Sequence, residues 1–241
     1  MRYTHHLKIY KKRSYLLITF AIVVLPFLFI LIFSPLTGVN TTQVFIDIGA
    51  SFMRVAVAYV ISLVLAIGIA VFLGQGRAGD FTLPLLDVLQ SFPSFALLPL
   101  FTVWFGAGNT SAIFFLIITI VWPILFSTVS AIKMARNDLQ EAAHIFGARG
   151  IKKLLAFTVP VALPGLVTGS IVGVGEGWEA IVGAEIIGVT PGIGGFLNNA
   201  SSQGNLLVLA YGIVALMLFL FSLNKIIWLP LLKRSHDYSH E

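Results

Sequence analysis

The stretch Asp138–Pro164, DLQEAAHIFGARGIKKLLAFTVPVALP, is a long polar interruption between two strongly apolar blocks. Asp138 is suited to cap a helix that carries Glu141 at its third position, as in a capping box. Gly147 can adopt the left-handed conformation that ends such a helix. The apolar residues of this short amphipathic helix are Leu139, Ala142, Ala143, Ile145 and Phe146. We therefore expect a structured segment, suited to docking a partner, between two membrane spans.

The composition is that of an integral membrane protein. The chain has 241 residues, of which 58% are hydrophobic and only 10% charged, whereas soluble domains carry about 25% charged residues. It has no cysteine, which excludes disulfides and thiolate metal sites. The basic N-terminus precedes an apolar run too long for a signal-peptide core, so we expect a retained first span.

Six apolar segments are long enough to cross a bilayer, which takes roughly 20 residues each. We expect all six to be helices, because a backbone in lipid must satisfy its own hydrogen bonds and no alternating barrel pattern is present. The predicted fold class is an all-α integral membrane protein with six transmembrane helices. The segments run approximately over 15–33, 54–73, 85–105, 110–131, 163–187 and 206–230.

The basic residues predict the orientation of these spans. The loops at about 34–53, 106–109 and 188–205 contain no lysine or arginine, and Arg54 is expected at a membrane edge. Lysine and arginine are enriched in cytoplasmic loops, so both termini and the Asp138–Pro164 stretch are predicted to be cytoplasmic. The residues assigned to that side are Arg2, Lys8, Lys11, Lys12, Arg13, Arg77, Lys133, Arg136, Arg149, Lys152, Lys153, Lys233 and Arg234.

The third segment contains Pro84, Pro93 and Pro99. Proline removes a backbone donor and bends a helix, so we expect this span to be broken or kinked. A packing kink and a role in lining a pathway are equally open interpretations.

The fifth segment carries glycines at every fourth position: Gly165, Gly169, Gly173 and Gly177. Such a ladder allows another helix to approach closely. We expect a tight helix crossing, either within the chain or across a dimer.

The same segment contains Glu176, Glu179 and Glu185, with Trp178 between the first two. Ionisable groups at bilayer depth mark a pathway, a proton site or a paired interior contact. Glu176 and Glu179 share a helix face, and we predict that Glu176, Trp178, Glu179 and Glu185 line a translocation pathway. The alternatives are that Glu185 reaches the external headgroup region and that Glu179 pairs with a polar group on another helix.

The outer segment GVTPGIGGFLNNASSQGN, residues 188–205, is rich in Gly, Asn and Ser. This composition is typical of turns. We expect a connector, with a reach back over the mouth of a pathway as the alternative.

Several catalytic signatures are missing from the sequence. It contains no phosphate-binding G-x-x-x-x-G-K-[ST] loop, no H-E-x-x-H and no G-x-S-x-G elbow. The chain is therefore expected to bind no ATP, cofactor or metal itself and not to be an enzyme. Anionic lipid and topology explain the basic N-terminus better than nucleic acid does.

The order Glu141-Ala142-Ala143, then Gly147-Ala148, then Leu163-Pro164 closely resembles the EAA loop of ABC-importer inner-membrane permeases. From about Ser51 onward the chain is similar to the nitrate/sulfonate/taurine subfamily, through SFPSFALLPLFTVWFGAGN, GWEAIVGAEIIG and PGIGGFL. Glu185 matches the glutamate of that subfamily's Ala-Glu pair. The resemblance implies a small solute of the nitrate, sulfonate, taurine or bicarbonate type, or a related organic compound, as substrate. Glu176 and Glu179 depart from the subfamily's pattern, which leaves the individual substrate open.

The resemblance implies a MetI-like type I permease fold in a prokaryotic inner or plasma membrane. Its organisation would be a cytoplasmic N-terminus at 1–14, a first transmembrane helix and outer loop at 15–50, a permease core at 51–232 with a coupling loop at about 136–160, and a cytoplasmic tail at 233–241. The coupling residues it implies are Asp138, Leu139, Glu141, Ala142, Ala143, Phe146, Gly147 and Ala148. The implied partners are a second permease copy, two cytoplasmic ATPase subunits that bind the ATP, and an extracytoplasmic solute-binding protein.

Three other functions remain open from the sequence. The nearest is a permease of another ABC-importer subfamily, of the methionine or osmoprotectant type. A channel would use the glutamates as a cation site without ATP. An intramembrane enzyme would use Glu176 and Glu179 as an acid/base pair, although no nucleophile or metal set accompanies them.

Overall fold

The computed structural model describes residues 2–73, 79–134, 150–153, 157–189 and 191–240, and the side chains of most of these. The described residues form helices and their connections. In chain order these are α1 (Arg2–Thr37), α2 (Thr41–Leu73), α3 (Gly79–Gln90), η1 (Ser94–Leu97), α4 (Leu98–Phe105), α5 (Asn109–Lys133), α7 (Gly150–Lys153), α8 (Val159–Ile187), α9 (Ile193–Ser202), α10 (Leu206–Leu223), η3 (Asn224–Trp228) and α11 (Leu229–His240). The predicted all-α class is confirmed.

Within the described part of the chain, five helices are long and apolar enough to cross a membrane: Ile18–Thr37, Thr41–Leu73, Asn109–Lys133, Val159–Ile187 and Leu206–Ser235. The pair Thr82–Gln90 and Ser94–Phe105 is bent by 71° and counts as a sixth span if taken as one. The break falls at Pro93, where the backbone is extended before η1 begins. The predicted break in the third segment is therefore confirmed.

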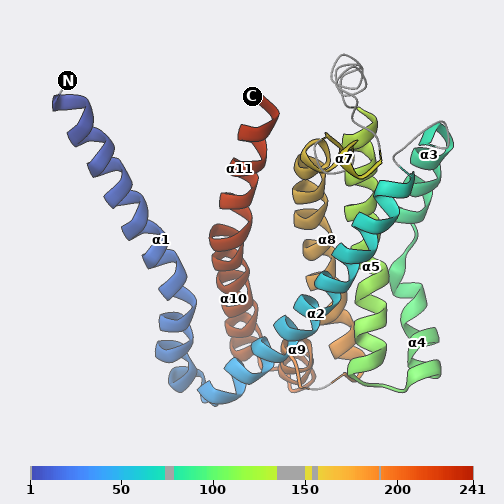
Figure 1. The fold of residues 1–241 in the computed structure, drawn as a ribbon. Coiled ribbons are helices and arrows are strands. Elements are labelled where there is room, and N and C mark those ends of the chain that lie inside the picture. The colour runs from blue at the N-terminus through green and yellow to red at the C-terminus, as the bar shows by residue number, and fades with distance from the viewer. Residues whose placement is uncertain (1, 74–78, 135–149, 154–156, 190, 241) are drawn as a thin grey trace.

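α5 is the central helix of the bundle. Of its most apolar stretch 61% is buried inside the chain, against 17–28% for the other four single spans. It packs against α8 on one side and α2 on another. α2 runs diagonally across the bundle, and α1 leans outward at its edge beside α10 (Figure 1). The apolar core therefore lies around α5, and most of the apolar side chains of α1 face outward.

The predicted glycine ladder is the contact surface between α8 and α5. A Cβ on Gly169 would lie 2.6 Å from the Pro123 carbonyl oxygen, and one on Gly173 would lie 2.8 Å from that of Ile120. A Cβ on Gly165 would collide with the Ser127 carbonyl oxygen, and one on Gly177 with the Ile120 side chain. The close crossing that the sequence predicted is thus made within the chain.

Two segments differ from the sequence prediction. The outer loop expected at 34–53 is only a short connection, because Gly38 ends α1 with φ 72° and the Asn40 side chain accepts from Thr42 N at the start of α2. Ten residues assigned to the first-helix unit, 41–50, therefore belong to α2. The segment expected as a connector at 188–205 contains α9, a ten-residue helix.

Candidate functional site

The predicted coupling residues Asp138, Leu139, Glu141, Ala142, Ala143, Phe146, Gly147 and Ala148 lie outside the described residues. Their flanks are described: α5 ends at Lys133 and α7 begins at Gly150. Both flanks lie at the end of the bundle that also holds the two chain termini (Figure 1). The stretch therefore joins α5 to α8 at that end.

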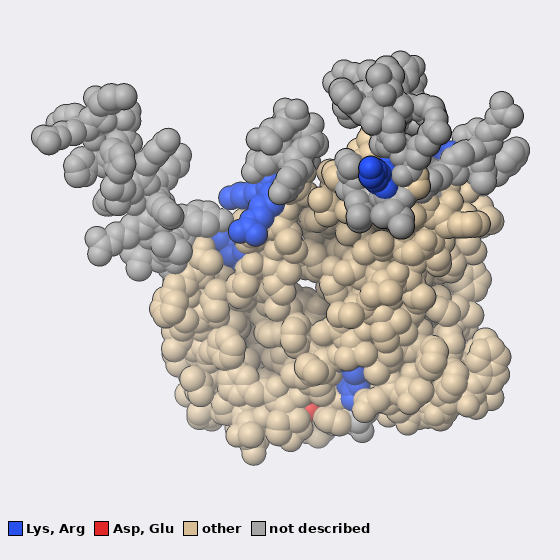
Figure 2. Space-filling model, viewed as in Figure 1, with Lys and Arg blue, Asp and Glu red and all other residues tan. Residues whose placement is uncertain are grey.

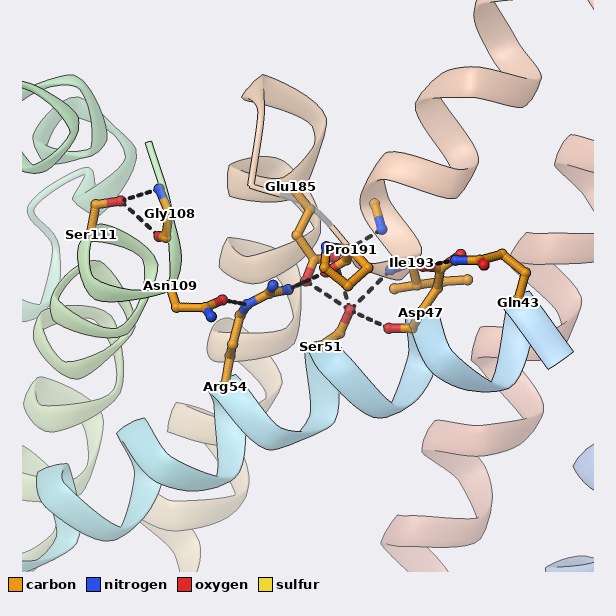
Figure 3. Close-up of polar contacts among 11 residues, drawn as sticks. Gln43, Asp47, Ser51, Arg54, Gly108, Asn109, Ser111, Glu185, Pro191 and Ile193 are labelled. Atoms are coloured by element: carbon orange, nitrogen blue, oxygen red, sulfur yellow. Dashed lines mark hydrogen bonds and ion pairs between the residues drawn. The ribbon is translucent and has the colours of Figure 1, made fainter. Parts of the chain in front are cut away.

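A polar cluster lies at the opposite end of the bundle, where α2, α5, α8 and the start of α9 meet (Figure 3); its side chains are buried except that of Asn109. We call it the Arg54–Glu185 cluster, made of the side chains of Asp47, Ser51, Arg54, Asn109 and Glu185 and the backbone of residues 191–194. Arg54 Nη1 lies 2.6 Å from Glu185 Oε1. The two residues are 5% and 1% exposed, so this ion pair is shielded from solvent.

Arg54 also donates to two acceptors outside the ion pair. Its Nε donates to Asn109 Oδ1 at 2.7 Å, and Nη1 donates to the Pro191 carbonyl oxygen at 2.6 Å. One guanidinium therefore connects α2 with α5, α8 and the connection that leads into α9. The planar, multi-donor shape of arginine suits such a buried junction.

The Glu185 carboxylate is satisfied from three directions. Besides Arg54 it accepts from Ser51 Oγ at 2.8 Å and from Gly194 N at 2.9 Å. Taking a carboxylate out of water is costly unless it is paired and its remaining lone pairs are used. These partners make that burial tolerable.

The first turn of α9 is capped by side chains of other helices. Ile193 N donates to Ser51 Oγ at 3.0 Å, and Gly194 N donates to Glu185 Oε2 at 2.9 Å. The first N–H groups of a helix have no partner within the helix. Here Ser51 of α2 and Glu185 of α8 supply two of these partners, and the Glu185 carboxylate also complements the positive end of the α9 dipole.

Two glycines make this capping possible. A Cβ on Gly192 would overlap the Glu185 carboxyl group, and one on Gly194 would overlap the Val182 carbonyl oxygen. The α9 backbone therefore lies directly against α8. The glycines that led to the prediction of a connector here allow α9 to approach α8 closely.

The predicted pathway residues on α8 have different surroundings. Glu176 is half-buried and Glu179 is exposed, whereas Trp178 is buried. Glu185 is enclosed in the cluster and paired with Arg54. The structure thus separates Glu185 from Glu176 and Glu179, and the assignment of all four residues to a pathway stays a prediction.

Trp178 lines a cavity of about 370 Å³ between α2, α8 and the α10–α11 helices. Its wall is mostly apolar, and Tyr59 and Trp228 pack edge to face in it with ring centroids 5.7 Å apart. The π-helical turn η3 contributes Asn224 to the lining. Neither Glu176 nor Glu179 lines this cavity.

The described residues contain no group of three His, Asp or Glu side chains that could hold a metal ion. On the face shown in Figure 2, most of the described lysine and arginine side chains lie toward the end of the bundle that holds the termini, and a smaller basic patch lies at the opposite end. At the end that holds the termini, the basic residues whose side chains are described are Lys133, Lys152, Lys153, Lys225, Lys233 and Arg234.

The sequence prediction missed most of the Arg54–Glu185 cluster. It found Glu185 but placed Arg54 at a membrane edge and gave no role to Asp47, Ser51 or Asn109. A signal was present: opposite charges stood near the same end of two predicted spans, and intramembrane charges commonly pair with each other.

Comparison with known proteins gives a family match over most of the chain. Residues 58–229 match the family "Binding-protein-dependent transport system inner membrane component". Three relatives are the taurine transport system permease protein of Escherichia coli, 28% identical over 73% of this chain; the nitrate import permease protein of Leptolyngbya laminosa, 31% over 75%; and the bicarbonate transport system permease protein of Synechococcus elongatus, 33% over 70%. The matched regions span 66%, 67% and 63% of those relatives' own lengths.

Proposed function

Because the chain belongs to the family of binding-protein-dependent transport system inner membrane components, we propose that it is the translocating subunit of an ATP-driven importer. As a member of this family it is a multi-pass inner-membrane permease of the ABC-importer type, and the predicted resemblance to nitrate, sulfonate and taurine permeases is confirmed. In the proposal it forms the substrate pathway and is driven by a separate ATPase.

The observation that carries the proposal is the position of the described flanks of the predicted EAA segment. α5 ends at Lys133 and α7 begins at Gly150 at the end of the bundle that holds the termini, and α5 touches α8 through the glycine ladder. Apart from Arg54, the described lysine and arginine side chains gather at the same end on the face that Figure 2 shows. By the positive-inside rule this end is cytoplasmic, where an ATPase subunit can reach the segment.

In this proposal, Leu139, Ala142, Ala143 and Phe146 fill an apolar groove on the ATPase, and the small alanines allow close approach. Glu141 caps the helix or meets a basic group of the partner. Gly147 permits the turn back toward the membrane. The complete transporter holds a second permease copy, two ATPase subunits that bind ATP, and an extracytoplasmic binding protein.

The proposed substrate is a small solute of the taurine, nitrate or bicarbonate type, after the names of the relatives, or a related organic compound. On α8, Glu176 is half-buried and Glu179 is exposed. We assign them, with Trp178, to the pathway that forms when a second copy completes the transporter. Two carboxylates there disfavour a bare anion unless they are paired or protonated.

The test is uptake by the chain reconstituted in liposomes with and without the ATPase and binding protein encoded beside it. ATP-dependent uptake that needs both partners supports the proposal. Equal flux from the chain alone, without ATP, would identify a channel instead, and chemical turnover by the chain alone would identify an enzyme.

A further inference from the structure

We propose that Arg54 and Glu185 are positioning residues for transport: they pin the first turn of α9 to α2 and α8, so that these three helices move as one body. α9 is then a fixed part of its end of the bundle and not a separately opening lid. Only the transport measurement below rests on the proposed function. The attachment of α9 to α2 and α8 is tested on the chain by itself, by labelling and cross-linking.

The polar half of this joint between α9 and its neighbours α2 and α8 consists of two consecutive backbone donors, Ile193 N and Gly194 N. Their acceptors are Ser51 and Glu185, which lie on two other helices and are both buried. For α9 to swing away from α2, these donors and acceptors would have to separate in a region closed to solvent. Each unpaired buried polar group opposes that movement.

The ion pair adds a stronger constraint. Arg54 Nη1 contacts both Glu185 Oε1 and the Pro191 carbonyl oxygen at 2.6 Å. A movement of the 191–194 backbone would therefore remove partners from both charges at once. An uncompensated buried charge is strongly unfavourable, so separation of α9 is coupled to disruption of the pair.

The apolar half of the joint lies on the other side of the α9 start. Ile193 is fully buried in one cluster with Val44 and Ile48 of α2 and with Tyr211 and Ala215 of α10. Gly192 and Gly194 lie so close to α8 that a Cβ on either residue would overlap it. Polar and apolar contacts thus hold the same turn from opposite sides.

Because the chain has no cysteine, a single introduced cysteine reports the accessibility of its own position alone. Ala200 lies on α9 and is 4% exposed, so Ala200→Cys should react slowly with a maleimide in purified, detergent-solubilised permease. Glu185→Gln keeps the shape of the side chain but leaves Arg54 unpaired. We expect it to raise the labelling rate about a hundredfold through local opening of α9.

Two further variants separate pinning from general loss of structure. Arg54→Gln combined with Glu185→Gln leaves no buried charge unpaired and should recover part of the protection. Asp87→Asn removes an exposed carboxylate on α3 and should leave labelling unchanged. Labelling that is equally slow in Glu185→Gln, or equally fast in Asp87→Asn, would overturn the proposal.

The one-body movement is tested by a covalent link between α2 and α9. The Ile193 side chain is buried in one cluster with Val44 and Ile48 of α2, so Ile193→Cys combined with Val44→Cys or with Ile48→Cys should give at least one pair that forms a disulfide under mild oxidation. We expect the oxidised, reconstituted transporter to keep at least about half the uptake rate of its reduced form. Failure to cross-link, or uptake abolished by oxidation and restored by reductant, would contradict the proposal. If even the unmodified chain does not transport, the proposed function fails, while labelling and cross-linking still decide the pinning.

Discussion

Gly169 of α8 lies so close to Pro123 of α5 that a Cβ added to it would stand 2.6 Å from the Pro123 carbonyl oxygen. The neighbouring atom is backbone and cannot rotate away. We expect Gly169→Ala to lower the stability of the folded permease by about 1–3 kcal/mol, as overpacking does. Gly68→Ala is the matched control, because no atom lies within 4 Å of a Cβ there, and it should be neutral or stabilising by up to about 1 kcal/mol. Thermal unfolding in detergent measures both, and equal midpoints would refute the tight crossing.

The predicted coupling segment gives a second prediction. Glu141→Lys reverses the charge at the start of its helix, and Gly147→Val places a β-branched residue where a left-handed turn is expected. Both should reduce ATP-driven uptake at least about tenfold while ATP hydrolysis and membrane insertion persist. His144→Gln, at a position that the EAA resemblance does not specify, serves as the control. Wild-type uptake in both variants would show that coupling does not pass through these residues.

Glu176 is predicted to act in the pathway and not in the fold. Its half-buried side chain lies on α8 beside the glycine ladder, and Glu176→Gln keeps its size while removing the charge. We expect uptake to change about tenfold with an altered pH profile, while thermal stability stays within about 0.5 kcal/mol, as for changes away from the core. An unchanged rate and pH profile would remove Glu176 from the pathway.

The attachment of α1 to the bundle depends partly on one hydroxyl pair. Ser34 Oγ and Tyr211 Oη lie 2.5 Å apart, and Ser34 is fully buried. Tyr211→Phe leaves the Ser34 hydroxyl without this partner and should cost about 1–3 kcal/mol. Adding Ser34→Ala should restore part of the loss, since no unpaired hydroxyl then remains. A double-mutant cycle on thermal unfolding measures the coupling, and additive effects would argue against it.

Local sequence signals predicted much of the fold. Apolar runs predicted the long helices, Pro93 predicted the break in the third span, and glycines at every fourth position predicted the close helix crossing that α5 and α8 make. Each of these features depends on residues close together in the chain. They could therefore be found without knowing which helices are neighbours.

The Arg54–Glu185 cluster and α9 depend on contacts that no local pattern contains. Ile193 and Ser51 are 142 positions apart, and the helix that begins at Ile193 is supported by caps from other helices. Its glycines favour turns when considered alone. In the folded chain they allow backbone to approach backbone, so the same composition supports a packed helix.

The contact of α5 and α8 has a mechanical consequence. Gly165, Gly169 and Gly173 bring the two backbones into close contact over several turns, and Gly177 meets the Ile120 side chain. Sliding of one helix along the other would cause steric collision. A displacement of the chain between α5 and α8 would therefore move the two helices together. At the other end of this helix pair, Asn109 of α5 and Glu185 of α8 both accept from the Arg54 guanidinium. A displacement at the end that holds the termini would therefore also move the residues that hold Arg54 at the opposite end.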